Sequence, residues 1–115
     1  MDHLDVEVRI YQLPDGRVPY LEWLEGLKDQ QARQRIQARF ARIRLGNFGQ
    51  TRSVGGGVHE LKVDYGPGYR VYFGRDGQHI VILLCGGDKG TQDEDITKAR
   101  TYWENYKRER KNADG

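Results

Sequence analysis

The sequence of 115 residues has one cysteine and no long apolar run. A single cysteine excludes an intramolecular disulfide, and the apolar segment around Cys85 favours a small buried side chain at that position. No stretch approaches the roughly 18 apolar residues that a membrane-spanning helix needs. The N-terminal residues 1–5 are polar and acidic, unlike a signal peptide. The length predicts a single small domain over residues 1–115. The absences predict a location in the cytoplasm without a membrane partner.

Motifs for metals and nucleotides are also missing. The Cys/His spacing of a zinc site does not occur, so we expect neither a metal nor another cofactor. The segment "GGDKGT" at 86–91 lacks the G-x-x-x-x-G-K-[ST] spacing of a phosphate-binding loop. In "GGGVHE", Glu60 takes the place of the last glycine of a dinucleotide fingerprint. The three histidines show no pairing in the sequence that would indicate acid–base catalysis.

Charge is distributed unevenly, although the net charge is only +2. Residues 28–52 carry seven basic side chains against one acidic side chain, and residues 107–111, "KRERK", add a second basic cluster. A basic middle and a basic end favour a polyanionic partner. The alternative is a solvated helix surface that an acidic partner balances.

Hydrophobic periodicity predicts an α+β fold with the order β-α-α-β-β-β-α. Alternation over residues 5–11 predicts a first strand, and Pro19 suits the first turn of a short helix. Asp29 is the expected N-cap of a longer helix that ends near Leu45. The apolar stripe of this second helix consists of Ala32, Ile36, Phe40 and Ile43.

The second half of the chain predicts three strands and a closing helix. The strands are expected over residues 58–64, 69–75 and 79–85. The Asp76-Gly77 pair predicts a two-residue hairpin, and the last strand is apolar enough to be buried on both faces. Thr91 and Glu94 match a capping box at the start of the closing helix. A frayed tail is expected over about 108–115.

Strand alternation separates a core face from a polar face. Residues directly opposite each other in an antiparallel pair point to the same face. If Leu61 and Val71 share the core face, then Lys62, Arg70 and Tyr72 stand together on the other face. Two cationic side chains beside a phenol contribute little to a hydrophobic core. They are suited to binding a phosphate group. The joint at Lys89, just after the buried strand, is either a simple turn or an anion site at the following helix.

Three segments carry a family resemblance: "ELKVDYGPGYRVYF", "LLCGGDKGTQDEDITKA" and "YWENYK". They resemble the RelE/ParE toxin superfamily, and within it the HigB-like branch of addiction-module killer proteins, also called phage Gp49-like. The resemblance extends from "YLEWLEGL" to Tyr106. It implies a RelE-like fold: an antiparallel twisted sheet with two helices on one face, a C-terminal helix, and an open basic cleft on the other face.

The resemblance implies the toxin of a type II toxin-antitoxin system, a metal-independent endoribonuclease that cleaves mRNA on the ribosome and blocks translation. The implied partners are the ribosome, mRNA and a small antitoxin of the same operon, expected to be a helix-turn-helix DNA-binding protein. The implied catalytic residues are Lys62, Arg70 and Lys89. The expected RNA-binding residues are Arg39, Arg42, Arg44, Arg52, Tyr72 and Gln92.

Several alternatives stay open. The reaction would be attack of a ribose 2′-hydroxyl on the adjacent phosphate, with Lys62, Lys89, Asp88 or a ribosomal group as the base. The rival function is ParE-like inhibition of DNA gyrase without chemistry, and a plain binding module is a third possibility. Arg70 on a polar face is expected to contribute little to stability. The arginine-flanked helix at 35–44 is the expected antitoxin contact.

Overall fold

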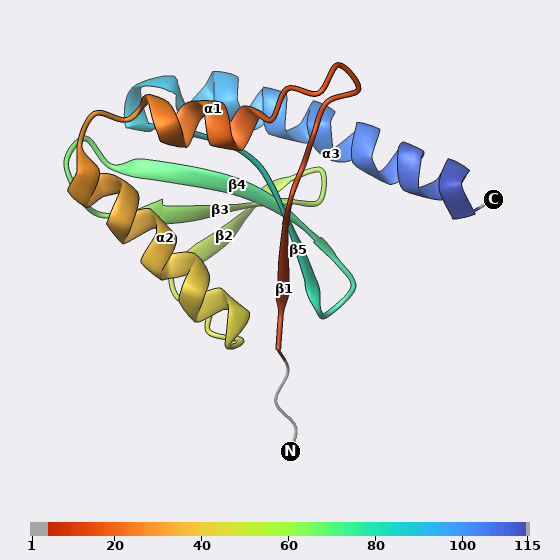
Figure 1. Cartoon of the computed structure of the whole chain (residues 1–115), viewed down its shortest axis with the longest axis horizontal. Coiled ribbons are helices and arrows are strands. Elements are labelled where there is room, and N and C mark those ends of the chain that lie inside the picture. Colours follow the sequence, from red (N-terminus) through yellow and green to blue (C-terminus); the bar gives the residue numbers. More distant parts are fainter. Residues whose placement is uncertain (1–4, 115) are drawn as a thin grey trace.

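The computed structural model describes residues 5–114, which fold around one five-stranded sheet (Figure 1). In chain order the elements are β1 (Glu7–Ile10), α1 (Pro19–Gly26), α2 (Gln30–Arg44), β2 (Thr51–Gly55), β3 (Val58–Val63), β4 (Tyr69–Asp76), β5 (Ile80–Asp88), the short 3₁₀ helix η1 (Lys89–Thr91) and α3 (Gln92–Asp114). The strand order across the sheet is β1-β5-β4-β3-β2. The α+β class and the closing C-terminal helix are confirmed.

The sheet differs from the predicted one in two respects. It is mixed rather than antiparallel, because β1 pairs with β5 in parallel while the other pairs are antiparallel. It also contains the extra strand β2, which the periodicity did not reveal. β2 is an edge strand whose side chains are mostly solvent-exposed, so it carries no alternation of apolar and polar residues. For β1, the alternation of apolar and polar residues predicts which side chains face the core. It does not predict whether the neighbouring strand runs parallel or antiparallel to β1.

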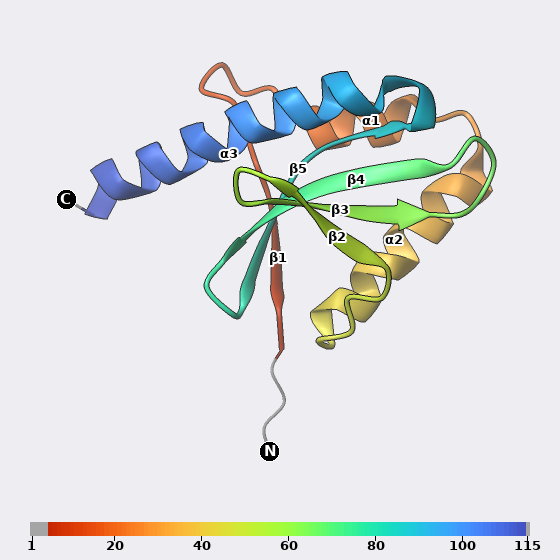
Figure 2. The same ribbon diagram turned by 180° about the vertical axis from the view of Figure 1, so that it is seen from behind.

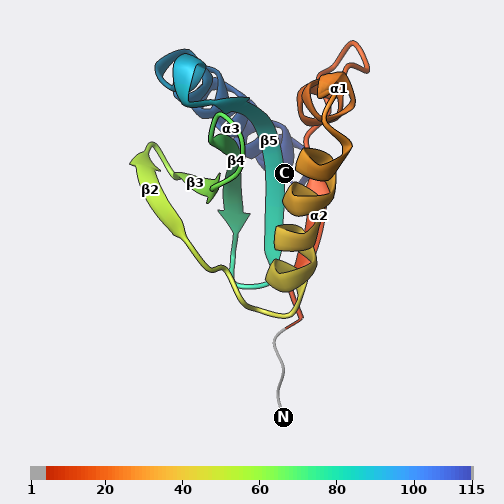
Figure 3. The same ribbon diagram turned by 90° about the vertical axis from the view of Figure 1, so that its left-hand side faces the viewer.

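The α1–α2 layer covers one face of the sheet, on the right in Figure 3. Asp29 caps α2 as predicted, since its carboxylate accepts hydrogen bonds from the amides of Gln31 and Ala32 at 2.9 and 3.3 Å. The stripe of α2 is fully used in this packing: Ala32, Ile36, Phe40 and Ile43 are all buried. The apolar side of α2 is therefore buried, and the arginines that flank it are the part of this helix left for an antitoxin.

Helix α3 covers part of the opposite face (Figure 2). A second cluster of buried side chains lies beneath it, comprising Tyr11, Val58, Tyr72, Ile82, Leu84, Cys85, Ala99 and Trp103. The helix continues through residues 108–114, where the sequence predicted a frayed tail, and its C-terminal part extends beyond the strands (Figure 2). None of the helices in the described part of the chain is both long and apolar enough to cross a membrane.

Glycines allow both helical layers to approach the sheet closely. A Cβ atom on Gly74 would overlap the indole of Trp103 from α3, and one on Gly86 would overlap the indole of Trp23 from α1. On the α3 side, a Cβ atom on Gly87 would overlap the carboxylate of Asp95. At the end of β5, Gly86 therefore leaves room for α1 on one face of the sheet, and Gly87 leaves room for α3 on the other.

We expect Gly74→Ala to destabilise the fold by about 1–3 kcal/mol, because the added methyl group overpacks the contact with Trp103. Gly26→Ala is the matched control. A Cβ atom at Gly26, the last residue of α1, meets no atom within 4 Å, so this change should be neutral or stabilising by up to about 1 kcal/mol. Urea denaturation of both variants measures the difference. Equal midpoints would show that α3 does not need a glycine beneath Trp103.

Candidate functional site

The pairing of β3 with β4 places the polar residues as the alternation predicted. Lys62 lies directly opposite Arg70, and Glu60 lies directly opposite Tyr72. Leu61 opposes Val71, and both pack in the core beneath α1 and α2. Lys62, Arg70 and Tyr72 therefore share the face that α3 partly covers.

The centre of this face is Glu60, an acidic side chain that is only 3% exposed. Its carboxylate is surrounded by four side chains from three other elements: Arg52 (Nε at 2.8 Å), Gln92 (Nε2 at 2.7 Å), Tyr72 (hydroxyl at 3.2 Å) and Arg70 (Nε at 3.6 Å). The first three donate hydrogen bonds. Buried charge is tolerated when such partners replace water. No sequence motif assigns a role to Glu60, although strand alternation with Leu61 predicts that its side chain lies off the core.

These contacts govern the ionisation of the site. Burial opposes the charged form of Glu60, but the hydrogen bonds from Arg52 and Gln92, the charge of Arg52 and the hydrogen bond from Tyr72 outweigh it. The pKa of Glu60 is therefore lowered. For Tyr72, burial and the neighbouring negative charge of Glu60 both raise the pKa. At neutral pH the pair consists of a carboxylate and a protonated phenol.

Arg70 is buried, which corrects the expectation of a solvent-facing arginine. Its side chain is 9% exposed and lies in ion-pair range of Glu60. The 3.6 Å separation is too long for a hydrogen bond, and Arg70 Nε has no other acceptor among the described residues. A second guanidinium nitrogen, Nη1, donates to the carbonyl of Gly68 at 3.0 Å. Arg70 is thus held at the base of the site, and its Nε can still donate a hydrogen bond.

Two adjoining hollows share Lys62, Asp64 and Arg70 in their walls, and together we call them the Arg70 cleft. The hollow toward β2 has a volume of about 530 Å³, and its other lining residues are Gln50, Thr51, Arg52, Glu60 and Gln92. The hollow toward the β3–β4 loop, of about 390 Å³, also includes Tyr65, Gly66, Pro67, Gly68 and Lys89. The structure therefore brings together the three residues expected to be catalytic.

The expected RNA-binding residues divide into four groups. Arg52 and Gln92 line the Arg70 cleft. Tyr72 is fully buried, so its side chain presents no surface to RNA in this structure. Arg39 donates from Nη1 to the carbonyl of Lys62 at 2.6 Å, a tie between α2 and β3. Arg42 and Arg44 are exposed on α2, in the helical layer that covers the other face of the sheet.

The joint after β5 is built from side-chain caps rather than from the predicted T-x-x-E box. Asp88 accepts a hydrogen bond from the amide of Gly90 at 2.8 Å and caps η1, so its carboxylate is partly engaged. Thr91 donates to the carboxylate of Asp95 at 2.5 Å instead of pairing with Glu94. Burial raises the pKa of Asp95 more than this hydrogen bond lowers it. The joint thus fixes the start of α3, where Gln92 meets Glu60.

Arg70→Ala should destabilise the protein by about 3 kcal/mol, well beyond the small surface effect expected from the sequence, because it removes a cation beside a buried carboxylate. Three hydrogen bonds to Glu60 remain and keep the loss near the low end for a broken buried pair. The matched control is Lys62→Ala: the Lys62 side chain is 47% exposed, and its ion-pair partner among the described residues is the exposed Asp64. It should change stability by no more than about 0.5 kcal/mol. Chemical denaturation of both variants measures their free energies of unfolding. Equal stabilities of the two variants would refute the structural role of Arg70.

The lowered pKa of Glu60 gives stability a specific pH dependence. The group stabilises the fold above its unfolded-state pKa, about 4.3, and this contribution is lost as pH falls through the lower folded-state value. We expect Glu60→Gln to lose about 1.5–3 kcal/mol at pH 7. The difference from wild type should shrink as the pH is lowered below about 4. Denaturation at a series of pH values tests this, and a difference independent of pH would argue against an ionised Glu60.

Comparisons with known proteins agree with the resemblance of the motifs. The chain matches the family described as "Phage derived protein Gp49-like (DUF891)" over residues 22–108, a span that contains the whole Arg70 cleft. It is also 51% identical over 78 residues to an "Uncharacterized protein" of Haemophilus influenzae (strain ATCC 51907 / DSM 11121 / KW20 / Rd), an alignment that covers 68% of this chain and 79% of that relative. No solved structure matches the chain. Because the matched span covers well over half of the sequence, this protein belongs to the phage-derived Gp49-like family, the HigB-like branch of addiction-module toxins that its motifs resemble.

Proposed function

We propose that this protein is the toxin of a type II toxin-antitoxin system and acts as a ribosome-dependent mRNA endoribonuclease that blocks translation. The observation that carries the proposal is the convergence of Lys62, Arg70 and Lys89 on one cleft. Three cations around a concave surface suit a phosphate group, and two of them come from facing positions of β3 and β4. Family membership supports the toxin class, and the cleft supports the chemistry.

The reaction we infer is attack of a ribose 2′-hydroxyl on the neighbouring phosphate, which leaves a 2′,3′-cyclic phosphate and a free 5′-hydroxyl. Negative charge grows on the phosphate oxygens in the transition state, and fixed cations stabilise it. Arg70 suits this role because its guanidinium is planar and is held by Glu60 and by the carbonyl of Gly68. Lys62 and Lys89 are exposed and supply mobile point charges.

Charge stabilisation is a better fit to this cleft than acid–base catalysis. Glu60 is a poor base, since its oxygens already accept three hydrogen bonds and its pKa is lowered. Tyr72 is a poor acid, because its pKa is raised and its side chain is buried. Asp88 is occupied in capping η1. We therefore infer that Glu60 is a positioning residue for Arg52 and Arg70, and that proton transfer depends on Lys62, Lys89 or a group of the ribosome.

A cognate antitoxin follows from the family. We propose that it is a small helix-turn-helix DNA-binding protein encoded in the same operon. Since the apolar stripe of α2 is buried, any contact with this helix would use its exposed arginines, such as Arg35, Arg42 and Arg44. Carboxylate-rich segments of an antitoxin are the complementary chemistry.

The test is mRNA integrity in a translating lysate, followed by mapping of the cut ends. We expect the wild-type protein to cut translated mRNA within codons. Lys62→Ala and Lys89→Ala should cut at least tenfold more slowly. Because these lysines are mobile point charges, the loss should be smaller than the roughly 10²–10³ typical of removing one preorganised donor. Lys28→Ala, which removes an exposed lysine outside the cleft, is the charge-matched control and should cut at the wild-type rate. Thermal melts of each variant verify folding.

Two results would contradict the proposal. Intact mRNA together with inhibited supercoiling by purified gyrase would favour the ParE-like alternative. Cleavage that is unchanged in both lysine variants would move the active site away from the Arg70 cleft.

A further inference from the structure

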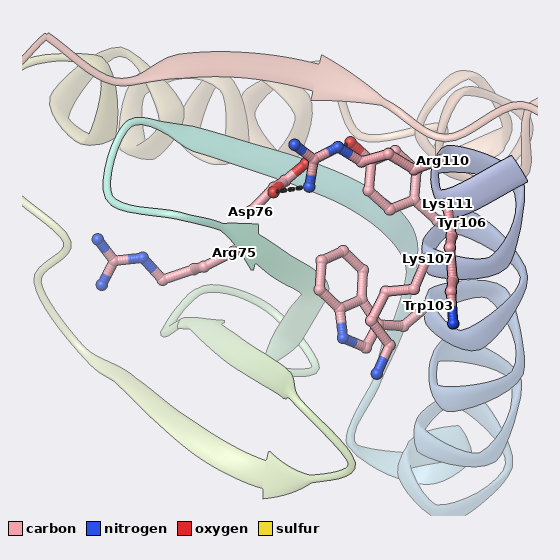
Figure 4. Close-up of a pocket in the computed structure, with 7 residues that line it drawn as sticks. All are labelled: Arg75, Asp76, Trp103, Tyr106, Lys107, Arg110 and Lys111. Carbon is pink, nitrogen blue, oxygen red and sulfur yellow. Dashed lines mark hydrogen bonds and ion pairs between the residues drawn. The ribbon is translucent and has the colours of Figure 1, made fainter. Parts of the chain in front are cut away.

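A second basic cleft lies between the β4–β5 hairpin and the C-terminal half of α3 (Figure 4). Its volume is about 510 Å³, and it is lined by Arg75, Asp76, Trp103, Tyr106, Lys107, Arg110 and Lys111. Four of these side chains are basic and one is acidic. We call this the α3 cleft. It contains most of the basic "KRERK" segment, which the Arg70 cleft does not use.

The single carboxylate of the α3 cleft is already neutralised. Asp76 accepts hydrogen bonds from the hydroxyl of Tyr106 at 2.8 Å and from Nη1 of Arg110 at 2.6 Å (Figure 4). Its side chain is 12% exposed, so little of its charge faces solvent. Asp76 thus serves to fix α3 to the hairpin and does not repel an incoming anion.

The remaining cations stand on both walls of the cleft. Arg75 projects from β4, where its guanidinium packs over the ring of Phe48 at 4.3 Å from the centroid. Lys107 packs over Trp103 at 5.8 Å from the ring centroid, and it pairs with Glu104 at 3.1 Å. Among the side chains of residues 5–113, no carboxylate lies within ion-pair distance of Arg75 or Lys111. Their uncompensated charges favour an anionic ligand.

The two clefts are connected by α3. Its first residue, Gln92, lines the Arg70 cleft, while Lys107 lines the α3 cleft fifteen residues further along. At a rise of 1.5 Å per residue this separation is about 22 Å along the helix axis. A nucleic-acid strand with about 3.4 Å between stacked nucleotides covers that distance with roughly six nucleotides. One continuous polyanion can therefore reach both clefts.

We propose that the α3 cleft binds the phosphate backbone of RNA several nucleotides away from the phosphate that is cut at the Arg70 cleft. This inference rests on the proposed function. Arg75 and Lys111 would each contact a phosphate without reading a base, since the aromatic side chains at the cleft are occupied: Trp103 is buried, and Tyr106 stacks on it. The contact would increase affinity and set the direction of the strand, with no part in the chemistry.

The experiment measures binding of a 5′-labelled, uncleavable 12-nucleotide 2′-O-methyl oligouridylate to the full chain by fluorescence anisotropy at several salt concentrations. The test variant is Arg75→Ala/Lys111→Ala. The charge-matched control is Lys28→Ala/Lys98→Ala, which removes two exposed lysines that line neither cleft. The same three proteins are assayed for mRNA cleavage in the translating lysate.

We expect the test variant to bind roughly tenfold more weakly near 0.1 M salt, with the slope of log K against log salt reduced by about 1.4, or about 0.7 for each lost phosphate contact on a single strand. The control should keep the wild-type slope. If test and control variants behave alike while wild type still binds RNA and cuts mRNA, the inference is overturned and the proposed function stands. If wild type neither binds nor cuts RNA, both fall. If a 12-residue polyglutamate displaces the RNA and shows the same loss in the test variant, the cleft recognises acidic peptides instead.

Discussion

The buried carboxylate of Glu60 is the constraint on which the functional face depends. It joins four elements: Arg52 belongs to β2, Glu60 itself to β3, Arg70 and Tyr72 to β4, and Gln92 to the first turn of α3. Leaving water is costly for a carboxylate unless its lone pairs are satisfied, so all four elements must adopt their relative positions at once. Formation of the cleft and docking of α3 are thereby energetically coupled.

A basic cleft combines exposed cations with a cation that is fixed in position, and in the Arg70 cleft these two roles belong to different residues. Lys62 and Lys89 are exposed, and the ion pair of Lys62 with Asp64 lies at the surface, whereas Arg70 is buried with a negative charge behind it. The carboxylate of Glu60 lowers the net charge of its pair with Arg70 but holds the guanidinium in place. Preorganised donors stabilise developing charge better than mobile ones, since they need no reorganisation during the reaction. Glu60 therefore acts through the geometry of its neighbours.

The sequence predicted those features that follow from local periodicity. Alternation placed Lys62 and Arg70 on one face, because the side-chain period of a strand is two, and Asp29 was identifiable as a cap from its position before the α2 stripe. The burial of Arg70 was missed, since alternation defines a face without saying what covers it. A signal was nevertheless present: the β5 segment is apolar on both faces, which requires cover on both sides of the sheet. Strand β2 pairs with β3 as a hairpin through Gly56-Gly57, but its exposed side chains show no alternation that would reveal it. The parallel direction of β1 depends on β5, which is distant in sequence, and no local pattern indicates it.

The two glycine contacts under the tryptophans have an additional consequence. The chain contains two tryptophans, and the structure assigns one to each helical layer: Trp23 rests on Gly86 beneath α1, and Trp103 rests on Gly74 beneath α3. Each indole therefore acts as an intrinsic fluorophore for its own side of the sheet. Replacing either one with phenylalanine leaves a single-tryptophan protein whose emission follows the separation of one helix from the strands, without an external label.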